Sequence, residues 1–137
     1  YPERHNGCAC ALAEEGLTPD PPTRFDAIAT EESGRRAARA LIDSGAPFDA
    51  IFAVSDLTAI GAMLELHDAG LTVPRDVAIV GFDDLAAARL AEPPITTIVQ
   101  DTRRAGDALV ETLIAKIEER APGSVTLPVE LVVRGSS

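Results

Sequence analysis

The sequence predicts an α/β fold in which a parallel sheet is flanked by helices. Two short apolar runs, at residues 48–54 and 77–82, have the length and composition of buried strands. Between them, residues 56–69 carry apolar side chains at helical spacing and are followed by glycine. A helix that connects two buried strands is typical of a βαβ unit, whose strands run parallel.

Polar residues follow both apolar runs. Ser55 and Asp56 come directly after the first run, and Asp83 and Asp84 come after the second. In open parallel sheets, ligands bind in the crevice beyond the carboxyl ends of the strands, so we expect the functional site there. Each residue also has a structural alternative. Ser55 or Asp56 can cap the helix at 56–69, and Asp83 or Asp84 can cap a short helix expected after them.

The first 45 residues predict two helices and one strand. A helix is expected over residues 2–15, because proline and glutamate suit its first turn and the glycine after it suits its C-terminal end. Three prolines then force an open loop. Residues 25–29 form a short strand candidate. Thr30 is expected to cap the next helix, which Gly45 ends.

The helix at 56–69 carries more apolar surface than one buried face requires. Its apolar residues are Leu57, Ala59, Ile60, Ala62, Met63, Leu64 and Leu66. They cover an arc of roughly 220°, against about 100° for an ordinary amphipathic helix. We therefore expect a partner subunit to cover part of this helix. The preceding strand, residues 49–54, alternates too little to be half-exposed and is expected to be covered on both faces.

The remaining elements follow from local signals. Residues 85–90 predict one or two helical turns, and the β-branched residues at 95–99 predict an extended segment. Thr102 is expected to cap a long helix. Its apolar stripe consists of Ala105, Leu109, Leu113 and Ile117. Residues 125–133 are expected to form an edge strand or an irregular ribbon, because Pro128 cannot donate to a ladder.

Composition indicates one soluble globular domain and excludes several functions. The 137 residues carry 22 acidic and 12 basic side chains, and this net charge of −10 would repel a phosphate backbone. Cys8 and Cys10 are expected to be small apolar residues in a reducing compartment. His5 and His67 lack a second ligand at zinc spacing, so neither a metal nor a cofactor is expected. Neither a membrane span nor a signal peptide is recognisable, and we expect a cytoplasmic protein.

Several motifs occur in a specific order along almost the whole chain. They read RHNG at 4–7, EESG at 31–34, DAIFAVSDLTAIGA at 49–62, GLTVP at 70–74, DVAIVGFDD at 76–84, PPITTI at 93–98, LP at 127–128 and LVVRG at 131–135. Each motif alone is a weak signal. Their joint order and spacing resemble the lactose-repressor (LacI/GalR) family of bacterial transcription regulators.

The resemblance implies a periplasmic-binding-protein-like fold with two Rossmann-like subdomains that close on a small effector. In that fold this chain would be truncated. Residues 1–98 would belong to the C-terminal subdomain, and 99–123 to a crossover and helix of the N-terminal subdomain. Residues 124–137 would form the return crossover and a terminal strand of the C-terminal subdomain. The helix-turn-helix that binds operator DNA would lie outside these residues, and the stripe of the helix beginning at Thr102 would lack its usual cover.

The resemblance also assigns residues to an effector site. Arg4 and Asp83 correspond to effector contacts, and Gln100 lies on a crossover that faces the cleft. Ser55 stands where sugar binders of the family usually have asparagine, and a hydroxyl lacks the paired donor and acceptor of an amide. Ala29 stands where an aromatic platform is common. Arg4 can instead be a simple exposed residue, and Gln100 a polar residue in a connection.

The resemblance implies a homodimer formed through the helix at 56–69, with Ile60, Met63 and Leu64, and through residues near Ala91. We therefore interpret the chain as the effector-binding and dimerisation module of a DNA-binding regulator, with a sugar or related metabolite as effector. A secreted solute-binding protein is the alternative.

An enzyme is not expected from these residues, and none is assigned a catalytic role. Asp83 and Asp84 are similar to the acidic pair that holds Mg²⁺ in a receiver domain. Such a site also needs a lysine at the end of a late strand, whereas Lys116, the single lysine, lies in the long helix. The sequence also lacks a nucleophile–base pair and a phosphate loop.

Overall fold

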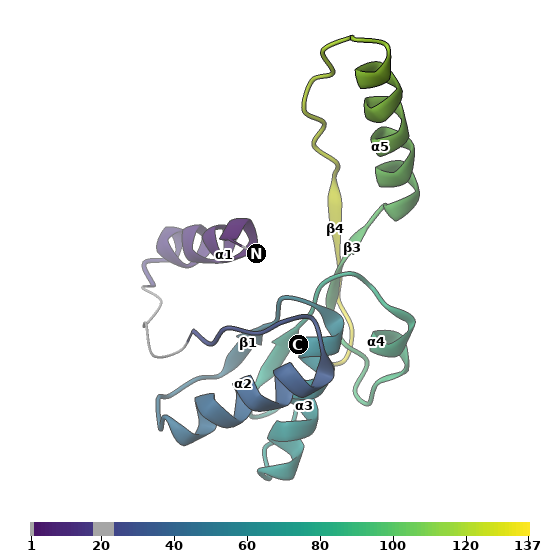
Figure 1. Ribbon diagram of the computed structural model, residues 1–137. Helices are drawn as coiled ribbons and strands as arrows, with labels where there is room; N and C mark the ends of the chain where they lie inside the picture. The colour runs from purple at the N-terminus through teal and green to yellow at the C-terminus, as the bar shows by residue number, and fades with distance from the viewer. Residues whose placement is uncertain (1, 18–23) are drawn as a thin grey trace.

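The computed structural model describes residues 2–17 and 24–137 (Figure 1). Its elements in chain order are α1 (Pro2–Glu14), α2 (Glu31–Asp43), β1 (Ala50–Phe52), α3 (Asp56–Asp68), β2 (Ala78–Val80), α4 (Ala86–Leu90), β3 (Thr97–Gln100), α5 (Thr102–Ile117) and β4 (Val129–Val132). Figure 1 shows a body formed by α2, α3, α4, β1 and β2, and an arm in which α5 extends away from it beyond β3 and β4.

The predicted βαβ unit is confirmed. β1 and β2 pair in parallel, with Ala50 opposite Ala78 and Phe52 opposite Val80, and α3 connects them. A parallel bridge from Val80 to Thr96 extends the sheet toward β3. The carboxyl ends of these strands therefore meet at one edge, as the sequence predicted.

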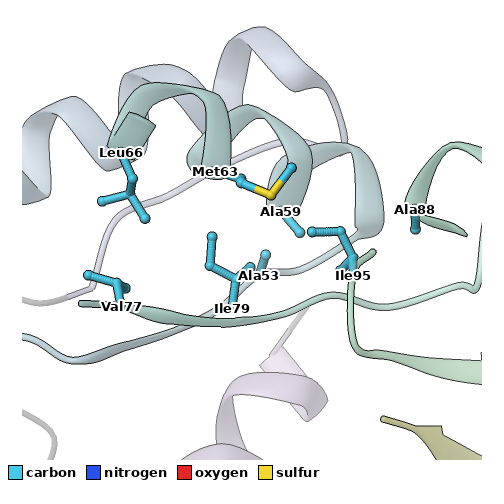
Figure 2. Close-up of a cluster of buried hydrophobic side chains, with 8 residues drawn as sticks. All are labelled: Ala53, Ala59, Met63, Leu66, Val77, Ile79, Ala88 and Ile95. Atoms are coloured by element: carbon cyan, nitrogen blue, oxygen red, sulfur yellow. The ribbon is translucent and has the colours of Figure 1, made fainter. Parts of the chain in front are cut away.

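The core lies between α3 and the sheet (Figure 2). Its fully or nearly buried members are Ala53, Ala59, Met63, Leu66, Val77, Ile79, Ala88 and Ile95. Leu66 from the helix and Ile79 from β2 have no exposed side-chain surface. Burial of a side chain of this size stabilises the fold by about 1.5–3 kcal/mol, so this layer holds α3 against the strand ends.

A second surface of α3 packs against α2. Gly34 of α2 and Gly61 of α3 allow this contact, because a Cβ at either position would overlap a backbone carbonyl of the other helix. Arg35 and Asp68 form an ion pair at 2.8 Å across the same interface. α2 and the sheet together cover much of the wide apolar arc of α3. Met63 is only 7% exposed and belongs to the core, so it offers little surface to a partner subunit, and its place in a subunit interface stays a prediction.

The caps of α2 follow the sequence signals. The Thr30 hydroxyl accepts a hydrogen bond from the backbone N–H of Ser33 at 3.2 Å. Gly45 adopts a φ of +67°, which a glycine reaches without steric cost. Both predicted ends of this helix are confirmed.

The strand expected at 25–29 is wrong. This segment is irregular, and side chains of the neighbouring helices satisfy part of its backbone. The N–H of Ile28 donates to the Ser33 hydroxyl at 3.0 Å, and the carbonyl of Ile28 accepts from the Thr58 hydroxyl at 3.1 Å. These bonds replace strand pairing for Ile28.

The expectation that the first strand is covered on both faces is also wrong. Phe52 is 39% exposed, because α3 covers one face of β1 only. The other face borders a mostly apolar cavity of about 620 Å³, which α1, α2 and residues 24–27 also line.

The arm carries an uncovered apolar stripe. β3 and β4 pair antiparallel, with Ile98 opposite Leu131. The side chains of Leu109, Leu113 and Ile117 are 60–72% exposed, so the described residues do not cover them, as expected. The predicted cap of α5 is wrong by one residue, because Asp101 rather than Thr102 accepts from the N–H of Arg104, at 2.9 Å.

Candidate functional site

Three of the four predicted site residues lie together at the carboxyl ends of the strands. Gln100, the last residue of β3, donates from its Nε2 to Oδ1 of Asp83 at 2.7 Å. The guanidinium of Arg4 in α1 lies 3.8 Å from the same carboxylate oxygen. All three side chains are partly exposed. The fold thus joins residues from three segments into one polar cluster.

Arg4 is held by contacts that the sequence analysis did not predict. Its guanidinium lies over the ring of Phe82, 3.7 Å from the ring centroid, and donates to the carbonyl of Val54. A cation over an aromatic face contributes about 0.5–2 kcal/mol, depending on its exposure to water. An aromatic residue directly before a carboxylate at a strand end was the available signal for Phe82.

Asp83 sits in a turn with an unusual backbone. Its φ is +109° and that of Asp84 is +54°. A non-glycine residue in a sparsely populated conformation costs about 1–3 kcal/mol and persists only when its surroundings fix it. The N–H of Asp83 donates to the carbonyl of Ile98 at 2.9 Å, which ties the turn to β3. The Asp83 carboxylate is therefore presented by a strained but supported turn.

The two adjacent carboxyl groups have opposite electrostatic environments. Burial raises the pKa of Asp83 above its ordinary value, with a smaller contribution from Asp56, although the charge of Arg4 acts in the other direction. Hydrogen bonds from Arg89 and then Arg134 lower the pKa of Asp84. Asp83 is therefore the carboxyl group of the pair that protonates first as pH falls.

Ser55 occupies the predicted strand end but turns toward its own helix. It is the N-cap of α3, and its hydroxyl accepts from the N–H of Thr58 at 3.3 Å. It also lies 3.0 Å from the Thr58 hydroxyl and is only 2% exposed. The structural alternative for Ser55, a helix cap, is what the structure shows.

The other acidic residues at these ends do not act as caps. Asp56 is the first residue of α3, and its carboxylate accepts from the N–H of Leu85 and the hydroxyl of Thr97, each at 2.6 Å. Asp84 forms ion pairs at 2.5 Å with both Arg89 and Arg134. Neither aspartate caps a helix as the structural alternative had it, because Leu85 and Thr97 bind the carboxylate of Asp56, and Arg89 and Arg134 bind that of Asp84.

The cavity of about 620 Å³ lies beside the polar cluster. Arg4 lines it, whereas Asp83 and Gln100 do not, and most of its lining is apolar. Among residues 2–17 and 24–137, no group of three His, Cys, Asp or Glu side chains is arranged to hold a metal ion. In the same described part of the chain, no helix has the length and apolar character that crossing a membrane requires.

The remaining residues expected at a subunit interface are partly buried. Ile60 and Ala91 pack against the core, and Leu64 on α3 is also partly exposed. The apolar side chain of Leu57, on the same helix, is exposed to solvent. Neither α2 nor the sheet therefore covers this part of α3.

The cluster combines a cation, a carboxylate and an amide. Together these supply donors and acceptors at one strand edge, a combination that hydrogen-bonds a polyhydroxylated molecule. It contains no nucleophile with an adjacent base. The arrangement therefore suits binding of a polar small molecule.

Comparison with known proteins agrees with this geometry. A model of the periplasmic binding protein-like domain matches residues 1–137. The transcriptional regulator CelR of Thermobifida fusca is 38% identical over 131 residues, which are 96% of this chain and 37% of CelR. A structure of a CelR–cellobiose complex aligns over 98% of this chain and 42% of that one, with 36% identity and a TM-score of 0.92.

A lac repressor dimer bound to operator and the anti-inducer ONPF aligns over 97% of this chain and 40% of that one, with 30% identity and a TM-score of 0.88. The chain thus spans about two fifths of the length of these relatives. The relatives are transcriptional regulators, which favours the regulator interpretation over a secreted solute-binding protein. The chain belongs to the LacI family of transcriptional regulators and forms part of its periplasmic-binding-protein-like domain.

Proposed function

We propose that the chain is the effector-binding and dimerisation part of a LacI-type regulator, and that the effector is a sugar or a related polyhydroxylated metabolite. The convergence of Arg4, Asp83 and Gln100 at one strand edge carries this proposal. The carboxylate accepts hydrogen bonds from sugar hydroxyls, whereas the guanidinium and the amide N–H groups donate to them. The CelR structure in complex with cellobiose supports a sugar as the ligand class.

The regulator acts by changing the population of its conformations. A ligand that contacts two subdomains in a closed state and one in an open state shifts the equilibrium toward closure. These residues do not contact operator DNA, because a chain with a net charge of −10 is a poor DNA ligand. Membership of the LacI family, which includes a repressor bound to operator, supports a helix-turn-helix outside these residues as the DNA contact. Such a protein works in the cytoplasm and carries out no catalysis.

Thermal unfolding of the full-length protein tests the sugar proposal. We expect cellobiose, or another sugar from a panel of mono- and disaccharides, to raise the unfolding temperature, because a ligand that binds only the folded state stabilises it. The shift should disappear with Asp83→Ala and persist with Asp43→Ala, which removes an exposed carboxylate at the end of α2. A nucleoside or purine panel serves as the competing class. A shift that survives Asp83→Ala would contradict the site.

We also propose that the exposed side of α3, with Ile60 and Leu64, forms the dimer interface together with Ala91, which follows α4. The lac repressor structure is a dimer, and the apolar surface of α3 that α2 leaves uncovered supports the same use here. Leu64→Arg should convert the full-length dimer to a monomer in sedimentation experiments, whereas Glu111→Arg on α5 should not. A dimer unchanged by Leu64→Arg would contradict this surface.

A further inference from the structure

Asp56 is a fully buried acidic residue that takes no direct part in the polar cluster. It opens α3 and has no exposed surface. Its Oδ1 accepts from the hydroxyl of Thr97 and its Oδ2 accepts from the N–H of Leu85, each at 2.6 Å. Its own N–H donates to the carbonyl of Phe82 at 2.8 Å. One residue therefore joins the start of α3, the end of β2 with its following turn, and the start of β3.

The segments that Asp56 joins are those that carry the site. Leu85 ends the turn that contains Asp83, and Thr97 begins the strand that ends at Gln100. The Thr97 hydroxyl, which donates to Asp56, also accepts from the N–H of Asp84 at 3.4 Å. The Asp56 carboxylate is thus hydrogen-bonded to both segments that carry the Asp83–Gln100 pair.

The surroundings leave the Asp56 carboxylate little freedom. Gly81 of the segment after β2 lies so close that a Cβ there would overlap Oδ1 of Asp56. Both carboxylate oxygens are used by donors from other segments. A side chain held in this way cannot move freely, so it fixes the positions of the groups that are hydrogen-bonded to it.

The turn needs such support because of its backbone. At a φ of +109°, Asp83 is outside the conformations that a non-glycine residue usually adopts. Without the bond from Asp56 to Leu85, one of the constraints on this turn is lost, and a relaxed turn would carry the Asp83 carboxylate away from Arg4 and Gln100. The geometry of the site thus depends on a bond that lies outside it.

We propose that Asp56 is a positioning residue for effector binding. Its carboxylate fastens the turn of Asp83 to the start of β3 and thereby sets the relation between Asp83 and Gln100. The effect on ligand affinity rests on the proposed sugar-binding function, whereas the support of the turn does not.

Four variants of the full-length protein test this proposal. Asp56→Asn keeps the size of the side chain, but its NH₂ group cannot accept one of the two hydrogen bonds. Thr97→Val removes the donor and leaves the carboxylate in place. Thr97→Ser keeps the hydroxyl and is the conservative variant. Asp76→Asn is the matched control, because Asp76 also accepts from a backbone N–H, that of Thr72 at 2.8 Å, but contacts no site residue.

Two measurements are made on each variant. Hydrogen exchange of the Asp83 and Leu85 amides is measured without ligand, and the affinity for cellobiose is measured by calorimetry. We expect Asp56→Asn and Thr97→Val to speed exchange at these two amides at least tenfold and to weaken cellobiose binding at least tenfold. Thr97→Ser and Asp76→Asn should change both quantities by less than about threefold, even where they lower overall stability.

The outcomes separate this inference from the proposed function. Unchanged exchange at both amides, or faster exchange with unchanged cellobiose affinity, would overturn the positioning role. If the wild-type protein binds no cellobiose or other sugar, the proposed function fails, and faster exchange in Thr97→Val still supports the hold on the turn. If Asp56→Asn does not fold, the contrast between Thr97→Val and Thr97→Ser decides the question.

Discussion

Replacing Gly61 by alanine should destabilise the protein, although alanine is the better helix former. The Gly61 position in α3 faces α2, where a Cβ would overlap the carbonyl of Glu31 and lie 3.0 Å from the N atom of Arg35. The two helices must therefore separate, and overpacking of this kind costs about 1–3 kcal/mol. The helix propensity of alanine returns about 0.5–1 kcal/mol. The midpoints of these two ranges leave a net loss of about 1 kcal/mol, and the largest overpacking cost leaves about 2.5 kcal/mol.

Gly106→Ala is the matched control for this prediction. Gly106 lies inside α5, and a Cβ there would have no other atom within 4 Å. The same chemical change should stabilise the protein by about 0.5–1 kcal/mol. Urea unfolding of the 137-residue chain, followed by circular dichroism at 25 °C, measures both variants. Equal or greater stability of Gly61→Ala would show that α2 and α3 are not packed as closely as the structure places them.

Three further predictions concern single side chains. The pKa of Asp83 lies above its ordinary value of 3.8, and sugar affinity should fall as the pH drops through it, because protonation removes a hydrogen-bond acceptor. In calorimetric titrations, Asp83→Asn should abolish this pH dependence. Hydrogen bonds from Arg75 and then Thr72 lower the pKa of Asp76 to about 2, so its contribution to stability is present above the unfolded value of 3.8 and is lost between about pH 4 and about pH 2. Acid unfolding of Asp76→Asn should lack that component of the pH dependence. Thr30→Ala removes the N-cap bond of α2 and should cost about 1 kcal/mol in urea unfolding, whereas Thr30→Ser should cost little.

Local signals in the sequence determined much of the fold. The cap at Thr30 and the glycine end of α2 depend on bonds and backbone angles within a few residues, so the sequence predicts them directly. The βαβ unit follows from two apolar runs and the helix between them. The order of the motifs also pointed to the LacI family, and with it to Arg4, Asp83 and Gln100.

Only the tertiary structure decided where the polar side chains at the strand ends point. Ser55 turns into its own helix, whereas Asp56 reaches across to Leu85 and Thr97. Either residue was a reasonable cap from sequence alone, because both types accept hydrogen bonds from a helix N-terminus. The direction of the Asp56 side chain is determined by hydrogen-bond partners that are 29 and 41 residues away in the chain.

Contacts between distant segments also determined the structure around Ile28 and the covering of α3. The composition of residues 25–29 suited a strand, but hydroxyls from α2 and α3 bind the backbone of Ile28. The apolar arc of α3 suited a partner subunit, but α2 covers part of the helix through the close approach at Gly34 and Gly61. Periodicity shows which face of a helix is apolar, and the packing of distant segments determines whether that face is covered and by what.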